Sequence, residues 1–383
     1  MHFAIFQLAL STLVLGPGDG DSSEAKTYSG RAADNEVATP ALDRAQIDID
    51  GRLDDAAWQQ AALLTSFTQF RQVEGVEASE RTEVRVLVDA EAIYFAIMAF
   101  DSDPSGIRAT LAERDSYTRS DDYVRLILDT FDDARRAYVF TVNPLGVQHD
   151  GIWNEGGGSA GRRHGNYGQP IDDNPDFLWD SDGAITEWGY QVEVRVPFKS
   201  LRFPEAEQQS WGLHVQRRIQ RSGFESSWAP ITANVSNKLT QAGKLNGLRN
   251  LDPGLFMELN PVLTGKRIGE FNAADGLFRR QDPSGDFGLN ATYGVTSNLT
   301  LDATYNPDFS QIEADAGQIA VNERFALFFP EKRLFFLEGT EIFGMAKQII
   351  YTRSVANPIA GAKLTGKLGS LNVGYLGAID QSF

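Results

Sequence analysis

The stretch DYVRLILDTFDDARRAYVFTVNPLGVQHD, residues 122–150, decides the fold that the sequence predicts. Apolar and polar residues alternate in two runs, 123–129 and 138–143, which are rich in β-branched and aromatic side chains. A period of two is typical of half-buried β-strands. The polar residues 132–136 between the runs predict a turn. We therefore expect a β-hairpin that gives one face to a core and keeps the other able to meet a ligand.

Composition restricts the classes of function. The chain has 383 residues, enough for two or three domains, and a formal net charge of -17. This charge argues against nucleic-acid binding, because a phosphate-binding surface needs a basic stripe. The absence of cysteine excludes disulfides, thiolate metal sites and cysteine nucleophiles. No apolar run reaches the length of about 18 residues that predicts a transmembrane helix.

The first 44 residues are expected to precede the folded part. Residues 3–15 have the length of a signal-peptide apolar region, although neither a preceding Lys or Arg nor a following Ala-x-Ala is present. We assign 1–20 as a candidate signal peptide, with a mis-assigned start or a buried strand as the alternatives. Residues 21–44 are small, polar and turn-rich, and predict a disordered linker.

Short alternating runs recur after the linker. They lie at 83–89, 93–100, 190–196 and 211–215, on either side of the opening hairpin, and Gly-rich or polar turns separate them. Several short strands at this spacing favour a β-sandwich. Trp179 and Trp211 fall in this pattern at inward positions, so we expect both in the core.

The character of the sequence changes after Pro253. Residues 255–263, 286–305 and 361–377 predict strands rich in Gly, Tyr, Asn, Thr and Leu, with weak alternation. Outer-membrane barrel strands have this pattern, and an ordinary soluble β-domain is the alternative. A membrane barrel must close, and single-chain bacterial barrels begin at about eight strands. We therefore expect either a fragment of a longer barrel or a different kind of domain.

An ordered series of strings carries a resemblance to a known family. The strings are DGRLDDAAW (50–58), FDSDP (100–104), ERDSYTRSDDYVRLILDTFDDARRAYVFTVNPLGVQHDG (113–151), VPFKSLRF (196–203), WGLHVQRRI (211–219), AGKLNGL (242–248), NPDFSQIEAD (306–315) and FFPEKRLFFLEG (328–339). In this order they resemble bacterial outer-membrane proteins with an N-terminal domain similar to carbohydrate-binding module family 9. A barrel domain of unknown function follows that domain in the family.

The resemblance implies an all-β architecture in two parts. The first, at 45–251, would be an immunoglobulin-like or jelly-roll-type β-sandwich. The second, at 252–383, would be the N-terminal part of an antiparallel outer-membrane-type β-barrel, incomplete at its C-terminal side. The implied location is the outer membrane, with the sandwich facing the periplasm or the cell surface.

The resemblance also implies carbohydrate binding. Sugar-binding members clamp a terminal sugar between two aromatic rings, but Arg119 (with Tyr117 nearby) and residues 236–238 occupy those positions here. Flat aromatic faces and planar polar groups suit a sugar, and loops at sandwich ends carry function more often than cores do. The candidate ligand-binding residues are Arg114, Asp115, Asp122, Arg125, Asn143 and Trp153. The alternatives are a surface ion pair for Asp122 and Arg125 and a core role for Trp153.

Other chemistry has weaker support in the sequence. We expect no cofactor, although Asp101, Asp103 and the pair Asp132–Asp133 could supply oxygens to a structural calcium ion. A glycosidase needs two carboxylates about 5–10 Å apart. The candidates for such a pair are Glu155, Asp172, Asp173, Asp176 and Glu193.

Three functions therefore stay open. The leading prediction is a non-catalytic protein of the cell envelope that binds a carbohydrate or a similar extracellular ligand. The second is a glycoside hydrolase, or its accessory domain, in carbohydrate catabolism. The third is a structural or transport barrel whose sandwich is a non-binding plug. A sandwich face filled by its own loops, with no exposed aromatic side chain, would favour the third.

Overall fold

The computed structural model describes most of the chain. The described residues are 26–116, 120–155, 171–173, 175–204, 206–251, 257–267, 269–272, 277–280, 282–296, 298–307, 334–337, 352, 355, 358–368 and 371–381. The candidate signal peptide (1–20), Tyr117 and Arg119 lie outside these ranges. No helix in the described part of the chain is long and apolar enough to cross a membrane.

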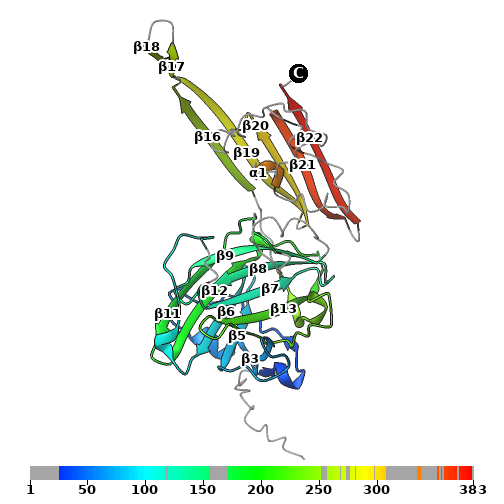
Figure 1. Cartoon of the computed structure of the whole chain (residues 1–383). Coiled ribbons are helices and arrows are strands. Elements are labelled where there is room, and N and C mark those ends of the chain that lie inside the picture. The colour runs from blue at the N-terminus through cyan, green and yellow to red at the C-terminus, as the bar shows by residue number, and fades with distance from the viewer. Residues whose placement is uncertain are drawn as a thin grey trace, which may run out of the picture.

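Two sheets form the sandwich in the lower half of Figure 1. One has six strands in the order β1 (Thr27–Ser29), β3 (Ala62–Thr65), β5 (Thr82–Val88), β6 (Ala92–Phe100), β12 (Gly189–Pro197) and β11 (Asp180–Thr186). The other has nine: β10 (Ile171–Asp172), β9 (Gln148–Asn154), β8 (Arg136–Val142), β7 (Tyr123–Asp129), β13 (Gln208–Ile219), β14 (Phe224–Ser227) and β4 (Thr68–Arg71) in order, with β15 (Gly243–Arg249) paired to β13 and β2 (Glu36–Ala38). Short 3₁₀ turns join them: η1 (Gly30–Ala32), η2 (Ala56–Gln60), η3 (Pro104–Gly106), η4 (Phe198–Ser200) and η5 (Leu239–Gln241).

The main core lies between the two sheets and follows the predicted alternation. The predicted hairpin is β7 and β8, and its inward side chains Val124, Leu126 and Phe140 are fully buried. Trp179 and Trp211 belong to the same cluster, which confirms their predicted core role. A second cluster, around Trp58 and Tyr94, covers the outer side of the six-stranded sheet.

The predicted disordered linker is wrong for residues 26–44. β1 pairs in parallel with β3, and β2 pairs in parallel with β15. Tyr28 and Val37 are fully buried, and the Tyr28 hydroxyl oxygen accepts a hydrogen bond from the Ala38 amide at 2.9 Å. The segment is polar overall, but two buried apolar side chains anchor it. Each short strand pairs with a strand from a later part of the chain, which local sequence does not reveal.

The strands predicted after residue 253 form a separate antiparallel sheet. Its order is β16 (Met257–Lys266), β19 (Ser284–Thr296), β20 (Leu299–Tyr305), β21 (Pro358–Leu368) and β22 (Leu371–Asp380). β17 (Gly269–Asn272) and β18 (Leu277–Arg280) form a hairpin between β16 and β19, and α1 (Leu334–Leu337) is a single turn. Among the described strands, β16 and β22 each pair on one side only, so these strands form an open sheet.

Candidate functional site

We expected the outer face of the nine-stranded sheet to meet a ligand. The side chains at the centre of this face are instead buried. Arg125 and Thr141 are paired across β7 and β8, with His149 next to Thr141 on β9. The Arg125 Nε donates a hydrogen bond to the Thr141 Oγ1 at 3.0 Å, and Arg125 is only 4% exposed. A guanidinium held in this way contributes to the packing of the sheet.

Trp153 is a core residue, and its predicted ligand-facing position is wrong. It is 6% exposed and packs in a third apolar cluster with Ile127, Val139 and Leu239. Its Nε1 donates a hydrogen bond to the Glu155 Oε1 at 3.2 Å. Pairing of β9 with β8 and β10 sets the Trp153 ring among apolar neighbours.

Asp122 and Asn143 have structural partners. The Asp122 carboxylate is fully buried and accepts hydrogen bonds from the amides of Arg108 (2.9 Å) and Gln220 (3.4 Å), and burial raises its pKa. It therefore does not form a surface ion pair with Arg125. The Asn143 Oδ1 accepts from the amides of Leu145 and Val147, which closes the turn after β8.

Arg114 and Asp115 do lie in a polar cluster. The Arg114 Nη2 is 2.7 Å from the Asp150 Oδ1 and 2.6 Å from the Asp176 Oδ1. Asp115, Asp150 and Asp176 each offer an oxygen within 4.8 Å of the others, which is a spacing that a cation could use. The guanidinium of Arg114 already supplies positive charge to two of these carboxylates, so the group is satisfied by the chain itself.

Three of the four candidate calcium ligands are paired with basic side chains, and the fourth, Asp103, accepts a hydrogen bond from the Ser105 hydroxyl at 2.6 Å. Asp132 and Asp133 form ion pairs with Lys244 and Lys367 respectively. The Asp101 Oδ2 lies 2.6 Å from the Arg221 Nη1. These cations satisfy the carboxylates that a calcium ion would need.

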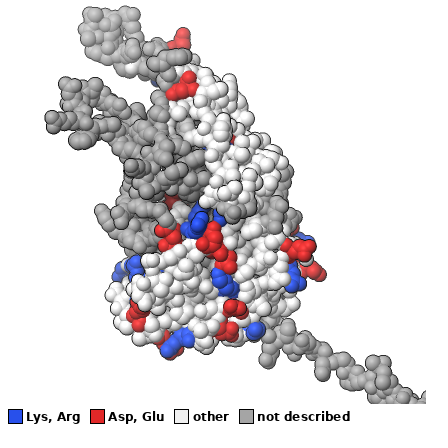
Figure 2. All heavy atoms as spheres, turned by 90° about the vertical axis from the view of Figure 1, so that its right-hand side faces the viewer, with Lys and Arg blue, Asp and Glu red and all other residues white. Residues whose placement is uncertain are grey.

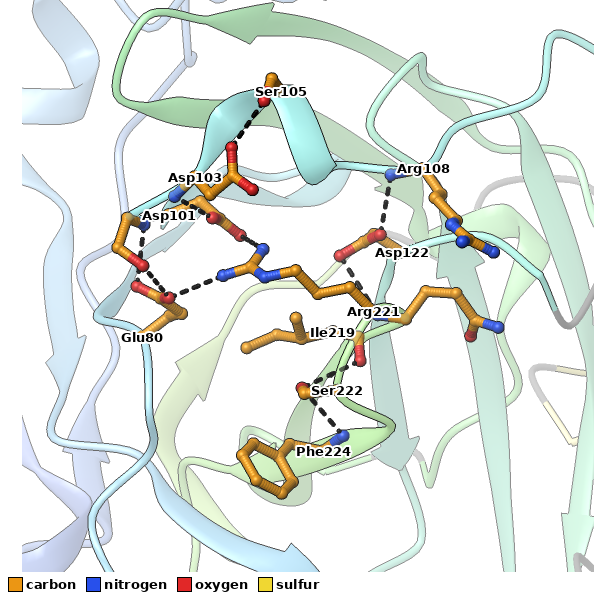
Figure 3. Close-up of polar contacts among 12 residues, drawn as sticks. Glu80, Asp101, Asp103, Ser105, Arg108, Asp122, Ile219, Arg221, Ser222 and Phe224 are labelled. Carbon is orange, nitrogen blue, oxygen red and sulfur yellow. Dashed lines mark hydrogen bonds and ion pairs between the residues drawn. The ribbon is translucent and has the colours of Figure 1, made fainter.

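Asp101 is the centre of a charge network at one end of the sandwich, drawn in Figure 3. Arg221 joins Asp101 to Glu80, whose Oε1 is 2.8 Å from the Arg221 Nη2. Arg217, which is fully buried, lies 3.6 Å from the Asp101 Oδ2 through its Nη2. This network ties β13 and the β13–β14 turn to the end of β6. Residue spacing could not reveal it, because its members are up to 141 positions apart.

An exposed aromatic group next to this network was missed by the sequence analysis. Trp188, in the turn between β11 and β12, is 37% exposed, and its ring centroid lies 4.9 Å from that of Phe100. The Arg81 guanidinium covers the Phe100 ring at 3.6 Å. The Trp188 carbonyl oxygen also accepts a hydrogen bond from the Asp101 amide at 3.0 Å. The signal in the sequence was an aromatic residue at the end of β6 and a second one in the turn between β11 and β12.

Glu193, a candidate glycosidase carboxylate, holds a loop in place. Its carboxylate is buried on β12 and accepts hydrogen bonds from the Trp58 Nε1 (3.0 Å) and from the amides of Asp50 and Gly51 (3.1 Å each). Burial raises its pKa to about 7. Glu155 follows β9 in the other sheet and accepts from the Lys238 amide at 2.6 Å. These two candidates therefore do not form a pair across a cleft.

One face of the five-stranded sheet is apolar and exposed. By strand register a single row across all five strands contains Met257, Tyr293, Leu301, Leu364 and Tyr375. The exposed large apolar side chains on this face are Met257, Leu259, Leu263, Phe287, Tyr293, Val295, Leu301, Tyr305, Leu368, Leu371, Tyr375 and Ile379. Figure 2 shows an almost uncharged surface here, above a band of charged side chains. Soluble monomers rarely expose a continuous apolar area of this kind.

The opposite face of the same sheet is polar and partly buried. Its buried side chains are Thr300, Asp302, Thr304, Lys363 and Thr365. The Lys363 Nζ lies 3.4 Å from the Asp302 Oδ2 and donates a hydrogen bond to the Phe335 carbonyl oxygen of α1 at 2.8 Å. Gly361 lets α1 approach closely, since an added Cβ would lie 2.8 Å from the Phe335 ring. The sheet thus exposes apolar side chains on one face and buries polar side chains on the other.

Comparison with known proteins gives one family match and several similar structures. Residues 271–367 match the model of a domain of unknown function, DUF5916. No curated protein sequence matches the chain. A carbohydrate-binding module family 9 protein from Caldicellulosiruptor kristjanssonii, solved with cellotriose, is 15% identical with a TM-score of 0.37, over 54% of this chain and 92% of that one. A putative carbohydrate-binding protein from Bacteroides uniformis is 9% identical with a TM-score of 0.43, over 55% and 98%.

Proposed function

We propose that this chain is a cell-envelope protein whose five-stranded sheet is part of the wall of an outer-membrane β-barrel and carries the sandwich at one end. The observation that supports the proposal is the contrast between the two faces of the sheet. Its apolar side chains are exposed, while Asp302 and Lys363 are buried on the other side. Outer-membrane strands alternate in this way, with apolar side chains toward lipid and polar ones toward the interior.

The lengths of four of the five strands suit a bilayer, and the fifth, β20, has 7 residues. β16 and β22 have 10 residues each, β21 has 11 and β19 has 13. A transmembrane β-strand tilted by about 45° needs roughly 9–11 residues. In lipid each unpaired backbone group costs several kcal/mol, so the edges of β16 and β22 require partner strands. The proposed wall is therefore larger than the five strands described.

Adjacent residues on β22 allow a direct test. The chain has no cysteine, so a single introduced cysteine can carry an environment-sensitive fluorophore. Ile379 lies on the apolar face and is 64% exposed, while its neighbour Ala378 is exposed on the opposite face. We would label Ile379→Cys and Ala378→Cys in the full chain, reconstituted in phosphatidylcholine–phosphatidylglycerol vesicles. Lipids with nitroxide-bearing acyl chains should quench the label at 379 and leave that at 378 much less affected.

Equal quenching at the two positions would reject a lipid-facing wall. So would failure of the folded chain to associate with the vesicles. A circular dichroism spectrum of each labelled variant matching that of the unsubstituted chain is the control for folding.

A second candidate function is carbohydrate binding by the sandwich, and Trp188 favours it. A sugar ring presents C–H groups that pack on a flat aromatic face, and its hydroxyls need polar partners close by. Trp188 offers such a face beside the charged network of Asp101, Glu80 and Arg221. A sugar site at Trp188 would lie apart from the one that the sequence predicted around Trp153.

Calorimetric titration of the full chain with mono- and oligosaccharides would test this second function. The panel would include cellotriose and glucose, which are the ligands in two solved structures of the family 9 module. Millimolar or tighter binding corresponds to about −4 kcal/mol or better. We expect Trp188→Ala to abolish it and Trp188→Phe to retain part of it. No binding to a folded protein, or equal binding by Trp188→Ala, would reject the site.

A further inference from the structure

The two ends of the five-stranded sheet differ in the length of their connections. At one end β19 joins β20 through residues 297–298, and β21 joins β22 through residues 369–370. These two turns are neighbours, since the Lys367 amide donates a hydrogen bond to the Asn298 carbonyl oxygen at 2.9 Å. At the other end the connections are long: 267–283 between β16 and β19, and 306–357 between β20 and β21.

The sandwich lies at the end with the short turns. The chain leaves β15 at Arg249 and enters β16 at Met257 on that side. Lys367, beside the β21–β22 turn, forms an ion pair with Asp133 in the β7–β8 turn of the sandwich. Its ammonium group also lies 4.1 Å from the centroid of the Phe131 ring in the same turn. Figure 1 shows the sandwich below the sheet, with the β17–β18 hairpin at the far end.

We propose that the sandwich is on the periplasmic side of the outer membrane. This inference rests on the proposed function of the sheet as a barrel wall. Barrels in this membrane have short periplasmic turns and longer extracellular loops. The opposite orientation would require a folded sandwich with many buried charges, or its unfolded chain, to cross the bilayer together with the strands. The long connections, in contrast, begin and end at the opposite end of the sheet.

The orientation also restricts the ligands available to Trp188. A periplasmic sandwich meets cell-wall glycan strands, or oligosaccharides that have already crossed the outer membrane. It does not meet polysaccharides too large to enter. A carbohydrate ligand of the sandwich would thus be a cell-wall glycan or a short, diffusible oligosaccharide.

Cysteine accessibility in cells tests the orientation. The full chain would be produced in the outer membrane of a Gram-negative host as two variants, Leu111→Cys and Asp282→Cys. Leu111 is 81% exposed on the sandwich, and Asp282 is exposed just before β19 at the far end of the sheet. A membrane-impermeant maleimide should label Asp282→Cys in intact cells. It should label Leu111→Cys only after the outer membrane is permeabilised, with at least a tenfold rise in labelling.

Labelling of Leu111→Cys in intact cells, with Asp282→Cys protected until permeabilisation, would overturn the orientation and leave the barrel wall untouched. Failure of the wall itself would be seen separately, as equal quenching at positions 378 and 379 or as chain that fractionates away from membranes. That result would reject both the proposed function of the sheet and the orientation that rests on it. Leu178→Cys, also well exposed on the sandwich, is a second reporter that guards against a local effect at Leu111.

Discussion

Replacement of Arg217 by Met should destabilise the sandwich strongly. The Arg217 side chain is fully buried, and its Nη1 donates hydrogen bonds to the Arg81 carbonyl oxygen (2.9 Å) and the Thr82 hydroxyl (3.1 Å). Its removal leaves the buried Asp101 carboxylate with Arg221 as its remaining basic partner in the network. Breaking a buried ion pair by removing one partner costs about 3–5 kcal/mol. For a domain of this size that corresponds to a fall in Tm of roughly 6–20 °C.

Arg221→Met is the matched control. Arg221 contacts the same Asp101 carboxylate, but 27% of its side chain is exposed, so water can replace part of what is lost. We expect it to cost about 1–2 kcal/mol. The double variant Arg217→Met/Asp101→Asn should recover part of the loss, because it removes the charge that Arg217→Met leaves less compensated.

Tryptophan fluorescence during urea unfolding of the full chain measures the free energy of unfolding of each variant. All six tryptophans, at positions 58, 153, 179, 188, 211 and 228, lie in the sandwich, so the signal reports on that part alone. If Arg217→Met stays within about 1 kcal/mol of the unsubstituted chain, or costs no more than Arg221→Met, the assignment of Arg217 to a stabilising buried network is refuted.

Three further substitutions have defined outcomes. Trp153→Ala should lower stability by about 3–5 kcal/mol in the same urea assay, as expected for a buried Trp, rather than remove ligand binding from a fully stable protein. Burial raises the pKa of Glu193 from 4.5 to about 7, so its contribution to stability is fully present below pH 4.5 and is lost as pH rises through about 7. The free energy of unfolding should therefore fall between pH 4.5 and 8, and Glu193→Gln should reduce this slope, while Asp129, whose pKa burial raises to about 6, still contributes to it. Gly189 has φ +146°, and an added Cβ would lie 2.1 Å from the Ala99 carbonyl oxygen, so Gly189→Ala should destabilise the sandwich by more than about 1 kcal/mol in thermal unfolding.

The core of the sandwich was predictable because it depends on local alternation. A strand with one buried face shows a period of two in its own sequence, so β7, β8 and β12 could be predicted along with their inward side chains. Burial of the opposite face depends on what covers it. Leu239 and β10 come from distant positions, and together with β8 they enclose Trp153. The prediction that Trp153 faces a ligand took it as part of a Gly-rich loop, whereas it lies on β9 and belongs to a core.

The contrast between the apolar and polar faces of the five-stranded sheet could be predicted only in part, for a related reason. Ala, Gly and Thr fill many positions of β20 to β22, so the contrast between the faces is weak within each strand. Only the register shows that Tyr293, Leu301 and Tyr375 share one row and that Asp302 and Lys363 lie together behind it. The contact between Trp188 and Phe100 could not be predicted for the same reason, because it joins the β11–β12 turn to the end of β6, nearly 90 residues earlier.

The parallel pairing of β2 with β15 has a consequence for the order of folding during synthesis. Val37 lies opposite Leu245, and the Trp228 indole donates a hydrogen bond to the Tyr28 carbonyl oxygen at 3.2 Å. β2 therefore pairs only after a strand about 200 residues later has been made, and contacts so far apart in sequence form slowly. Completion of the sandwich coincides with the arrival of β16, the first strand with an exposed apolar face. A chaperone that holds the chain through this interval would protect both parts at once.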